Sequence, residues 1–466
     1  MLGMGNMRQW LMNISLVGGW FPAAAFAVVA VLSVTLLVSA AVSKRDGRIL
    51  ATVLPIGVAA VSGMVGYVVA WLLSDVFVVF GVGLGSRVMA WVAAGFAIAG
   101  LAIAHIVLSR GMMRVAAAIL TVFAILAAAI GIDQSYGEYA TIGSLFGEDS
   151  YSQADLTGLA KRKDLITVAQ WRKQAANGTI RNIPANGTVN KIDIPATKSQ
   201  FEARKALVYL PPAALADSKR KPALPVVLML SGQPGSPGRV FQAGGIQTMM
   251  DGYAKTHDGL APIVIAADQL GADSHNTLCV DSKVYGNALT YLTQDVVDWV
   301  KTNLPAAQDA KDWAIAGFSQ GATCSLQIGV NHPDLFGTMI PTDSEIKPTN
   351  GSRQEMIDRF FDGDTTAYEN QVPVNAIRNH APTHQMLIIG AGEKDTTSIR
   401  NVKTIAPVAA KAGMRVAAVE SSGNAHDWHA VQDVLRYGLA VFGHDTGLDG
   451  ANPNLSDYPN LKRITI

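Results

Sequence analysis

The strongest chemical pattern in the chain is the sequence GFSQG at residues 317–321. The largely apolar run DWAIAGF that leads into it predicts a strand, and the segment after the second glycine predicts a helix. Glycines on both sides of the serine permit a tight turn that holds its hydroxyl above the end of the strand. The start of the helix favours negative charge that develops beside it. We therefore expect Ser319 to be a nucleophile; an ordinary strand-to-helix turn is the alternative.

A serine hydroxyl needs a base to accept its proton, and the base needs an acid to orient it. The chain order serine, acid, histidine is that of α/β-hydrolases. His426 is the expected base because it stands in the loop after the last predicted strand, whereas His429 and His444 fall in or beyond the closing helix. Asp395 is the expected acid, in the turn after the apolar run MLIIGAG, and Glu393 in the same turn is the alternative.

The negative oxygen that forms during attack on an ester needs two backbone N–H donors. The first expected donor is Gln320, directly after the nucleophile. The second is Gln233, in the loop SGQPGSPG that follows the predicted strand LPVVLML, because Gly232 and Gly235 allow a close backbone approach there. A plain glycine and proline turn is the alternative for this loop.

The chain has two cysteines, Cys279 and Cys324. On an exported domain an isolated pair predicts a disulfide, which would join the loop after the run PIVIAADQLG to the helix that follows Ser319. Closing a loop of about 46 residues would stabilise the fold by about 3–4 kcal/mol in the chain-entropy model. Two buried free thiols are the alternative. The chain has neither zinc-type cysteine spacing nor a nucleotide-binding loop, so we expect no metal and no cofactor.

Charge is distributed unevenly along the 466 residues, because residues 1–132 hold only nine charged side chains. That segment contains four apolar runs, each about as long as a bilayer-spanning helix requires. They are Gly19–Val42, Ile49–Leu73, Val88–Leu108 and Val115–Ile132. We therefore expect four membrane spans and contact with the lipid bilayer. The net charge of +1 gives no electrostatic reason to expect nucleic-acid binding.

Basic residues near the spans predict the orientation of the chain, because such residues accumulate on the cytoplasmic side. The first and third connections carry five of them, Lys44, Arg45, Arg48, Arg110 and Arg114, against Arg8 and Arg87 on the other side. Both termini and the remaining chain are then expected outside the cytoplasm, on a protein of the cell membrane. A cleaved signal peptide is the alternative for the first run, but that run is long and its positive charges follow it.

The remaining chain alternates predicted strands and helices, which indicates a mostly parallel sheet with helices on both faces. We expect an α/β-hydrolase domain at residues 187–447, preceded by a four-helix transmembrane domain at residues 1–132. Residues 133–186 are expected to connect the two domains. Residues 448–466, rich in Gly, Asn and Pro, are expected to form a tail.

The segments GFSQGA, LMLSGQPGSPG and AHDWH resemble the esterase D and mycolyltransferase branch of α/β-hydrolases, over about residues 187–445. The stretch ADQLGADSHNTLCVDSKVYGNALTYLTQDVVDWV is more similar still to actinobacterial membrane-anchored esterase-family proteins. This resemblance implies a Ser–acid–His triad, no metal and acyl-ester substrates. Ser319 matches the nucleophile, His426 the histidine, and Gln233 and Gln320 the oxyanion donors. The acid differs, because secreted mycolyltransferases place a glutamate in another local context, whereas GEKD follows the more usual hydrolase pattern.

We expect a membrane-anchored serine esterase that hydrolyses an acyl ester of an envelope lipid or glycolipid through an acyl-enzyme. The resemblance extends to membrane hydrolases that remove aminoacyl groups from envelope lipids, so an aminoacyl ester is one form that this substrate could take. Two alternatives stay open at this point. The first is an acyltransferase that moves the acyl group to a sugar or protein hydroxyl, and the second is a non-catalytic membrane sensor or scaffold.

Overall fold

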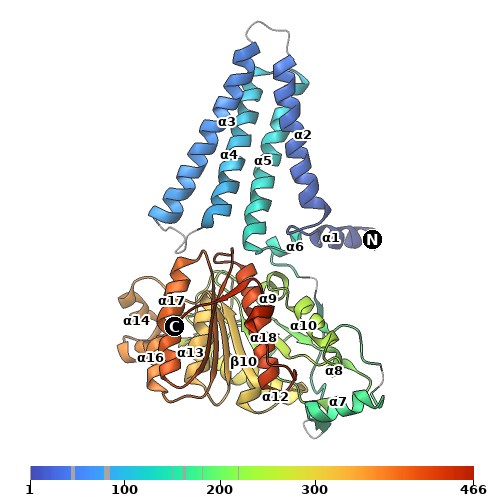
Figure 1. Ribbon diagram of the computed structural model, residues 1–466, viewed down its shortest axis with the longest axis vertical. Helices are drawn as coiled ribbons and strands as arrows, with labels where there is room; N and C mark the ends of the chain where they lie inside the picture. The colour runs from blue at the N-terminus through green and yellow to red at the C-terminus, as the bar shows by residue number, and fades with distance from the viewer. Residues whose placement is uncertain are drawn as a thin grey trace. The chain divides into compact units, whose positions relative to one another are not determined.

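The computed structural model describes residues 2–42, 48–77, 84–149, 151–160, 164–180, 182–218 and 220–466. The chain forms two compact units, Met1–Glu148 and Asp149–Ile466. Figure 1 shows the first unit as helices in blue and cyan, and the second as a sheet with helices from green to red. The first unit is helical wherever regular structure is described, and the second is mixed α/β.

The first unit contains the four predicted apolar helices. Its elements are α1 (Leu2–Met12), α2 (Trp20–Val42), α3 (Arg48–Trp71) continued by a π-helical turn (Leu72–Val76), α4 (Gly85–Leu108), α5 (Met112–Tyr136) and α6 (Ile142–Leu145). Among the described residues, four stretches are long and apolar enough to cross a membrane: Trp20–Val42, Thr52–Val76, Gly85–Leu108 and Met112–Tyr136. Of the basic residues used for orientation, Lys44 and Arg45 lie outside the described residues.

Small residues allow these helices to pack closely. Helix α4 contacts both α3 and α5, and α2 contacts α5. A Cβ atom added to Gly66 of α3 would lie 2.6 Å from the ring of Phe96, and one added to Gly131 would lie 2.2 Å from the ring of Trp91. A methyl group does not fit at either position, so the absence of a side chain sets how near the helices approach.

The second unit is built on a sheet with the spatial order β1-β3-β4-β7-β6-β10-β11-β12-β13-β14 among the described residues. These strands are β1 (Ser152–Gln153), β3 (Thr188–Ile192), β4 (Ala206–Leu210), β6 (Val226–Leu230), β7 (Ile263–Ala266), β10 (Trp313–Phe318), β11 (Thr338–Thr342), β12 (Met386–Gly392), β13 (Arg415–Ser421) and β14 (Leu461–Arg463). Neighbours from β7 through β13 run parallel. Strand β4 is antiparallel to β3 and β7, and β14 is antiparallel to β13.

Helices cover both faces of this sheet, as the alternation of strands and helices predicted (Figure 1). One face packs against α12 (Val296–Asn303), α13 (Gln320–Asn331), α16 (Pro373–Asn379) and α17 (Thr396–Lys411). The other packs against α9 (Pro237–Ala243), α10 (Ile246–Lys255) and α18 (Trp428–Asp445). Side chains of β10 alternate between the two cores, with Trp313 and Ile315 in the first and Ala314 and Ala316 in the second. The unit is therefore an α/β-hydrolase fold.

The other elements of the second unit are short. Strand β2 (Leu165–Ile166) pairs with β5 (Lys221–Pro222), and β8 (Asp281–Ser282) pairs with β9 (Gly286–Asn287). The helices are α7 (Val168–Ala176), α8 (Pro212–Leu215), α11 (Ala288–Thr290), α14 (Arg353–Phe360) and α15 (Thr365–Glu369), with a π-helical turn (Tyr291–Asp295) and 3₁₀ turns (Ala310–Asp312, Leu455–Asp457). Residues of α14 and α15 pack against Leu278 and Val280 in a small separate core.

The predicted connecting region, residues 133–186, does not behave as one segment. Its first part ends α5 and forms α6 in the first unit, whereas residues from Asp149 onward belong to the second unit. Strand β1 extends the sheet beside β3, and Trp171 of α7 is fully buried with its indole N–H donating to the Asp258 carbonyl at 3.2 Å. The buried apolar residues of this stretch are few and widely spaced, so its local composition does not predict that it packs against the core.

The predicted tail, residues 448–466, is also part of the second unit. Strand β14 pairs with the edge strand β13, and the side chains of Leu448, Leu461 and Ile464 are buried. A sheet edge presents unpaired N–H and C=O groups, which an added strand satisfies. This backbone pairing explains why a segment rich in Gly, Asn and Pro is ordered.

Candidate active site

Ser319 lies at a tight turn between β10 and α13, as the glycine pattern predicted. Its backbone has φ 55° and ψ −117°, a conformation that L-residues seldom adopt and that is concentrated at functional sites. A Cβ atom on Gly317 would lie 2.2 Å from the Gly321 carbonyl oxygen, and one on Gly321 would lie 2.3 Å from the Ser231 carbonyl oxygen. Both glycines are therefore needed for backbone to pass directly against backbone.

The structure brings together the three residues that the sequence proposed for the triad. His426 follows β13, and its Nε2 atom is 2.9 Å from the Ser319 hydroxyl oxygen. Its Nδ1 atom is 2.7 Å from Oδ2 of Asp395, which follows β12. The other carboxylate oxygen of Asp395 accepts the N–H groups of Thr397 and Ser398 at the start of α17. Helix α17 thereby holds the carboxylate in the direction of the imidazole.

Glu393, the alternative acid, is placed elsewhere. Its carboxylate accepts the Gly423 N–H at 2.7 Å and the Lys462 ammonium at 3.0 Å, and it faces solvent. His429 and His444 both belong to α18. Geometry therefore puts Asp395, and not Glu393, on the imidazole of His426.

His426 and Asp395 each favour the charged form of the other. Burial disfavours a charged His426, but the hydrogen bond to Asp395 and the negative charge of neighbouring carboxylates outweigh it and raise the His426 pKa. Burial also disfavours a charged Asp395, but hydrogen bonds from His426 and Ser398 outweigh it and lower the Asp395 pKa. Asp395 is therefore an anion at neutral pH, and it stabilises an imidazolium that forms beside it.

The two segments that carry the predicted oxyanion donors both adjoin Ser319. Gln320 is the first residue of α13, so its N–H is one of those with no acceptor inside the helix. In the second loop, a Cβ atom on Gly232 would lie 3.5 Å from the Ser319 Cβ, so the residue directly before Gln233 lies against the serine. The Gln233 side chain donates to the Ser274 carbonyl at 3.2 Å, and this contact fixes the loop from outside.

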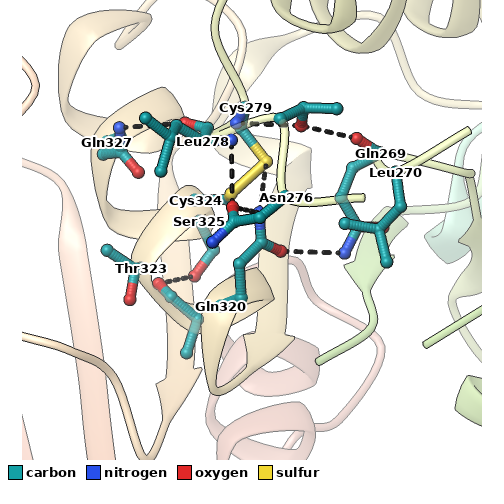
Figure 2. The surroundings of a disulfide bond; sticks show 12 residues. Gln269, Leu270, Asn276, Leu278, Cys279, Gln320, Thr323, Cys324, Ser325 and Gln327 are labelled. Atoms are coloured by element: carbon teal, nitrogen blue, oxygen red, sulfur yellow. Dashed lines mark hydrogen bonds between the residues drawn. A yellow bond between two sulfur atoms is a disulfide. The ribbon is translucent and has the colours of Figure 1, made fainter. Parts of the chain in front are cut away.

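The two cysteines form the predicted disulfide, which joins Cys279 to Cys324 of α13. Figure 2 shows the bond beside the side chain of Gln320, which donates to Asn276 Oδ1 at 3.3 Å and accepts from Gln269 Nε2 at 3.2 Å. The disulfide and these amide contacts together attach the loop after β7 to the start of α13. Neither Gln269 nor Asn276 was singled out from the sequence, because their partners are distant in the chain.

Asp343 is a further acid beside the site that sequence reasoning missed. It follows β11, is fully buried, and accepts the Gly392 N–H at 2.9 Å. Burial is the main cause that raises the pKa of Asp343 well above its usual range. The available signal was its place at the carboxyl end of a predicted strand, but only the order of the strands puts β11 between β10 and β12.

Ligand-type atoms of Asp343, Asp395 and His426 all lie within 4.8 Å of one another, a spacing that a metal site can share. Both ring nitrogens of His426 are already engaged, one with the Ser319 hydroxyl and the other with the Asp395 carboxylate. A metal ligand must instead offer a free ring nitrogen. The hydrogen bonds thus favour proton transfer over metal binding at this cluster.

Comparison with known proteins agrees with this geometry at the level of the family. The family model described as "Putative esterase" matches residues 198–438. An uncharacterised protein of Corynebacterium glutamicum is 33% identical over 328 residues, which cover 68% of this chain and 74% of that protein. Two similar solved structures are a ferulic acid esterase (TM-score 0.44, 16% identity, 57% of this chain and 99% of that chain) and an S-formylglutathione hydrolase from Agrobacterium tumefaciens (TM-score 0.45, 17% identity, 57% and 99%).

Replacing both disulfide cysteines by serine should destabilise the second unit. The bond closes a loop across a separation of 45 residues, so its loss should cost about 4 kcal/mol in the chain-entropy model. Thermal and urea unfolding of Cys279→Ser/Cys324→Ser, compared with the oxidised wild type, measures this effect. Addition of a reductant should lower the wild-type stability toward that of the variant. An unchanged midpoint under both treatments would contradict the assignment.

Substitutions at the two acids should separate them. Asp395→Asn keeps the oxygen that caps α17 but removes the charge beside the imidazole, so ester turnover at pH 7 should fall by at least about 10²-fold. Glu393→Gln removes an exposed acid that contacts Gly423 and Lys462, so turnover should stay within a few fold of wild type. Hydrolysis of a chromogenic short-chain ester reports both effects. A larger loss for the Glu393 variant would show that the acids are assigned in the wrong order.

The rate should also depend on pH in a direction set by His426. The imidazole must be neutral to accept the serine proton, and its pKa is raised above the ordinary value of 6.5. Activity is therefore expected to be low in acid and to rise with pH, with a midpoint above 6.5. The profile of kcat/KM and the rate of fluorophosphonate labelling of Ser319 should share this midpoint. A midpoint at or below 6.5 in both measurements would argue against the described pairing.

Proposed function

Because this chain belongs to the putative esterase family and is a serine hydrolase of the carboxylesterase type, we propose that it hydrolyses an acyl ester of a cell-envelope lipid or glycolipid. In this proposal Ser319, His426 and Asp395 are its catalytic triad. The observation that carries the proposal is the continuous hydrogen-bond chain from the serine hydroxyl to the imidazole, at 2.9 Å, and on to the carboxylate, at 2.7 Å.

The reaction begins with attack of the Ser319 oxygen on the ester carbonyl carbon. His426 Nε2 accepts the hydroxyl proton as the new C–O bond forms, and the carbonyl oxygen becomes an oxyanion. The backbone N–H groups of Gln320 and Gln233 donate to that oxyanion; one such donor is worth roughly 10²–10³-fold in rate. Asp395 keeps the proton of the neutral imidazole on Nδ1 and stabilises the imidazolium.

The intermediate then collapses and the ester C–O bond breaks. The alcohol part leaves with the proton held by His426, and the acyl group stays on Ser319 as an ester. A water molecule next gives its proton to His426 and attacks the acyl carbonyl. Collapse of the second intermediate returns the proton to Ser319 and releases the carboxylic acid, which restores the resting enzyme.

The first unit supports a membrane location for this chemistry. Its long helices expose apolar side chains over much of their outer surface, including Val107 at 71% and Val122 at 64%. Continuous exposed apolar surface of this kind is unfavourable in water and favourable in a bilayer. The excess of basic residues in the first and third connections supports an extracytoplasmic second unit. Covalent attachment to the spans then keeps the second unit near membrane-bound esters.

The direct test is to incubate full-length protein, in detergent or in vesicles, with an envelope lipid extract and to follow the products by mass spectrometry. Wild type should remove an acyl or aminoacyl group from one lipid class, and Ser319→Ala should reduce this by at least about 10³-fold. Ser325→Ala is a matched control, because this buried serine of α13 bonds only the Ala322 carbonyl among the described contacts. Its activity should stay within a few fold of wild type.

Other outcomes separate the remaining alternatives. Appearance of the acyl group on a sugar or protein hydroxyl, with wild type only, would identify an acyltransferase that uses the same serine. Failure of a fluorophosphonate to label Ser319 would favour a non-catalytic sensor or scaffold. Labelling of Ser319 without any change in the lipid extract would contradict the lipid substrate and direct attention to wall polymer and acylated proteins.

A further inference from the structure

A buried carboxyl group that the proposed reaction does not use lies beside the triad. Asp343 directly follows β11, the strand between that of the nucleophile and that of the acid. Its side chain is fully buried, with one oxygen accepting the Gly392 N–H at 2.9 Å. The other oxygen, Oδ2, has no hydrogen-bond partner among the described residues. Its backbone N–H donates to the Gly390 carbonyl at 2.9 Å, which fixes the residue to β12.

Two features of Asp343 reduce the stability of the fold. Its φ of 55° lies in the left-handed region, where residues other than glycine are uncommon. A buried polar atom without a partner also costs free energy, because it has lost its water and gained no replacement. Strained backbone and unsatisfied polar groups persist mainly where function requires them. Simple packing therefore does not account for an aspartate at this position.

The position relative to the triad suggests what the carboxyl does. Its ligand-type oxygen lies within 4.8 Å of both an Asp395 carboxylate oxygen and a His426 ring nitrogen. Two carboxyl groups this close in a dry site do not readily ionise together, so they share one proton. Burial, with the neighbouring charge of Asp395, raises the pKa of Asp343, whereas the pKa of Asp395 is lowered. In the resting site the proton therefore resides on Asp343 and the charge on Asp395.

We propose that Asp343 is a positioning residue that serves His426 as a second acid: it keeps its proton while Asp395 carries the charge, and it takes over that charge when Asp395 has none. This inference rests on the proposed triad. In the second state the Asp343 proton is released to water, and the carboxylate that remains stabilises the imidazolium formed during attack. The wild-type reaction needs no such transfer, because Asp395 already carries the charge.

Two other acids face the imidazole, and neither is placed to do the same. Asp427 caps α18 by accepting the Ala430 N–H at 3.0 Å, and its second oxygen accepts the Ala425 N–H at 2.7 Å. Glu345 lies two residues beyond Asp343 and is partly exposed, outside the cluster that lies within 4.8 Å. Asp343 is thus the acid that geometry connects to both members of the pair.

The test is a double-mutant cycle of Asp343→Asn and Asp395→Asn in the full-length enzyme, followed by kcat and KM across pH. Asp343→Asn alone should stay within about tenfold of wild type, because the amide resembles a protonated acid. Adding Asp343→Asn to Asp395→Asn should lower the activity by a factor roughly 10- to 100-fold larger than the factor by which Asp343→Asn lowers the activity of wild type. The kcat of Asp395→Asn should also rise with pH through an ionisation that the double variant lacks, with KM unchanged.

A matched control combines Asp395→Asn with Glu345→Gln, which removes a nearby acid outside the cluster. This variant should behave like Asp395→Asn alone. If the effects of the two original substitutions simply multiply, and no additional ionisation appears, Asp343 has only a structural role and the inference fails. Should Asp343→Asn not fold, as judged by thermal unfolding, the pH profile of Asp395→Asn alone decides the question. Absence of Ser319-dependent turnover in the wild type would instead overturn the proposed function, and the inference with it.

Discussion

The active site depends on one close contact between backbone segments. The turn at Ser319 requires Gly321 to pass directly against the carbonyl groups of Leu230 and Ser231. This contact joins the nucleophile strand β10 to its neighbour β6, the strand that leads into the proposed oxyanion loop. This approach of two main chains therefore accompanies the strained conformation of the serine, and it also brings the start of the second loop, at Gly232, against Ser319.

Burial then determines how the groups on this turn interact. Aromatic rings close one side of the site, with Phe318 5.0 Å from the ring of His426 and also 5.0 Å from that of Trp428. Loss of water strengthens the pairing of the imidazole with Asp395, and it also makes every further charge costly. The raised pKa of Asp343 has the same cause, because burial disfavours its charged form. One environment thus shifts the pKa values of two neighbouring aspartates in opposite directions, upward for Asp343 and downward for Asp395.

Rigidity at the start of α13 comes from contacts beyond the reacting groups. The disulfide between Cys279 and Cys324 and the amide network around Gln320 attach the loop after β7 to this helix. An oxyanion donor is useful only when it is held in place before the charge develops. The covalent bond and the buried amides supply that fixation at α13, the helix that begins directly after Ser319. Stability and catalysis are therefore linked at this helix.

The amino-acid sequence determined the features that depend on neighbours in the chain. Local spacing and composition predicted the turn at Ser319 and the position of His426 after the last long strand. They also predicted the four apolar helices and the alternation of strands and helices that produces the parallel sheet. The pairing of the two cysteines followed because the chain has no others. Tertiary structure alone decided the rest. Asp395 and Glu393 are two residues apart in one turn. Only the tertiary structure shows that the Asp395 side chain points toward the imidazole of His426 and that the Glu393 side chain points toward solvent. Asp343, Gln269 and strand β14 acquired their partners through the order of strands in the sheet, which brings together residues that no local pattern connects.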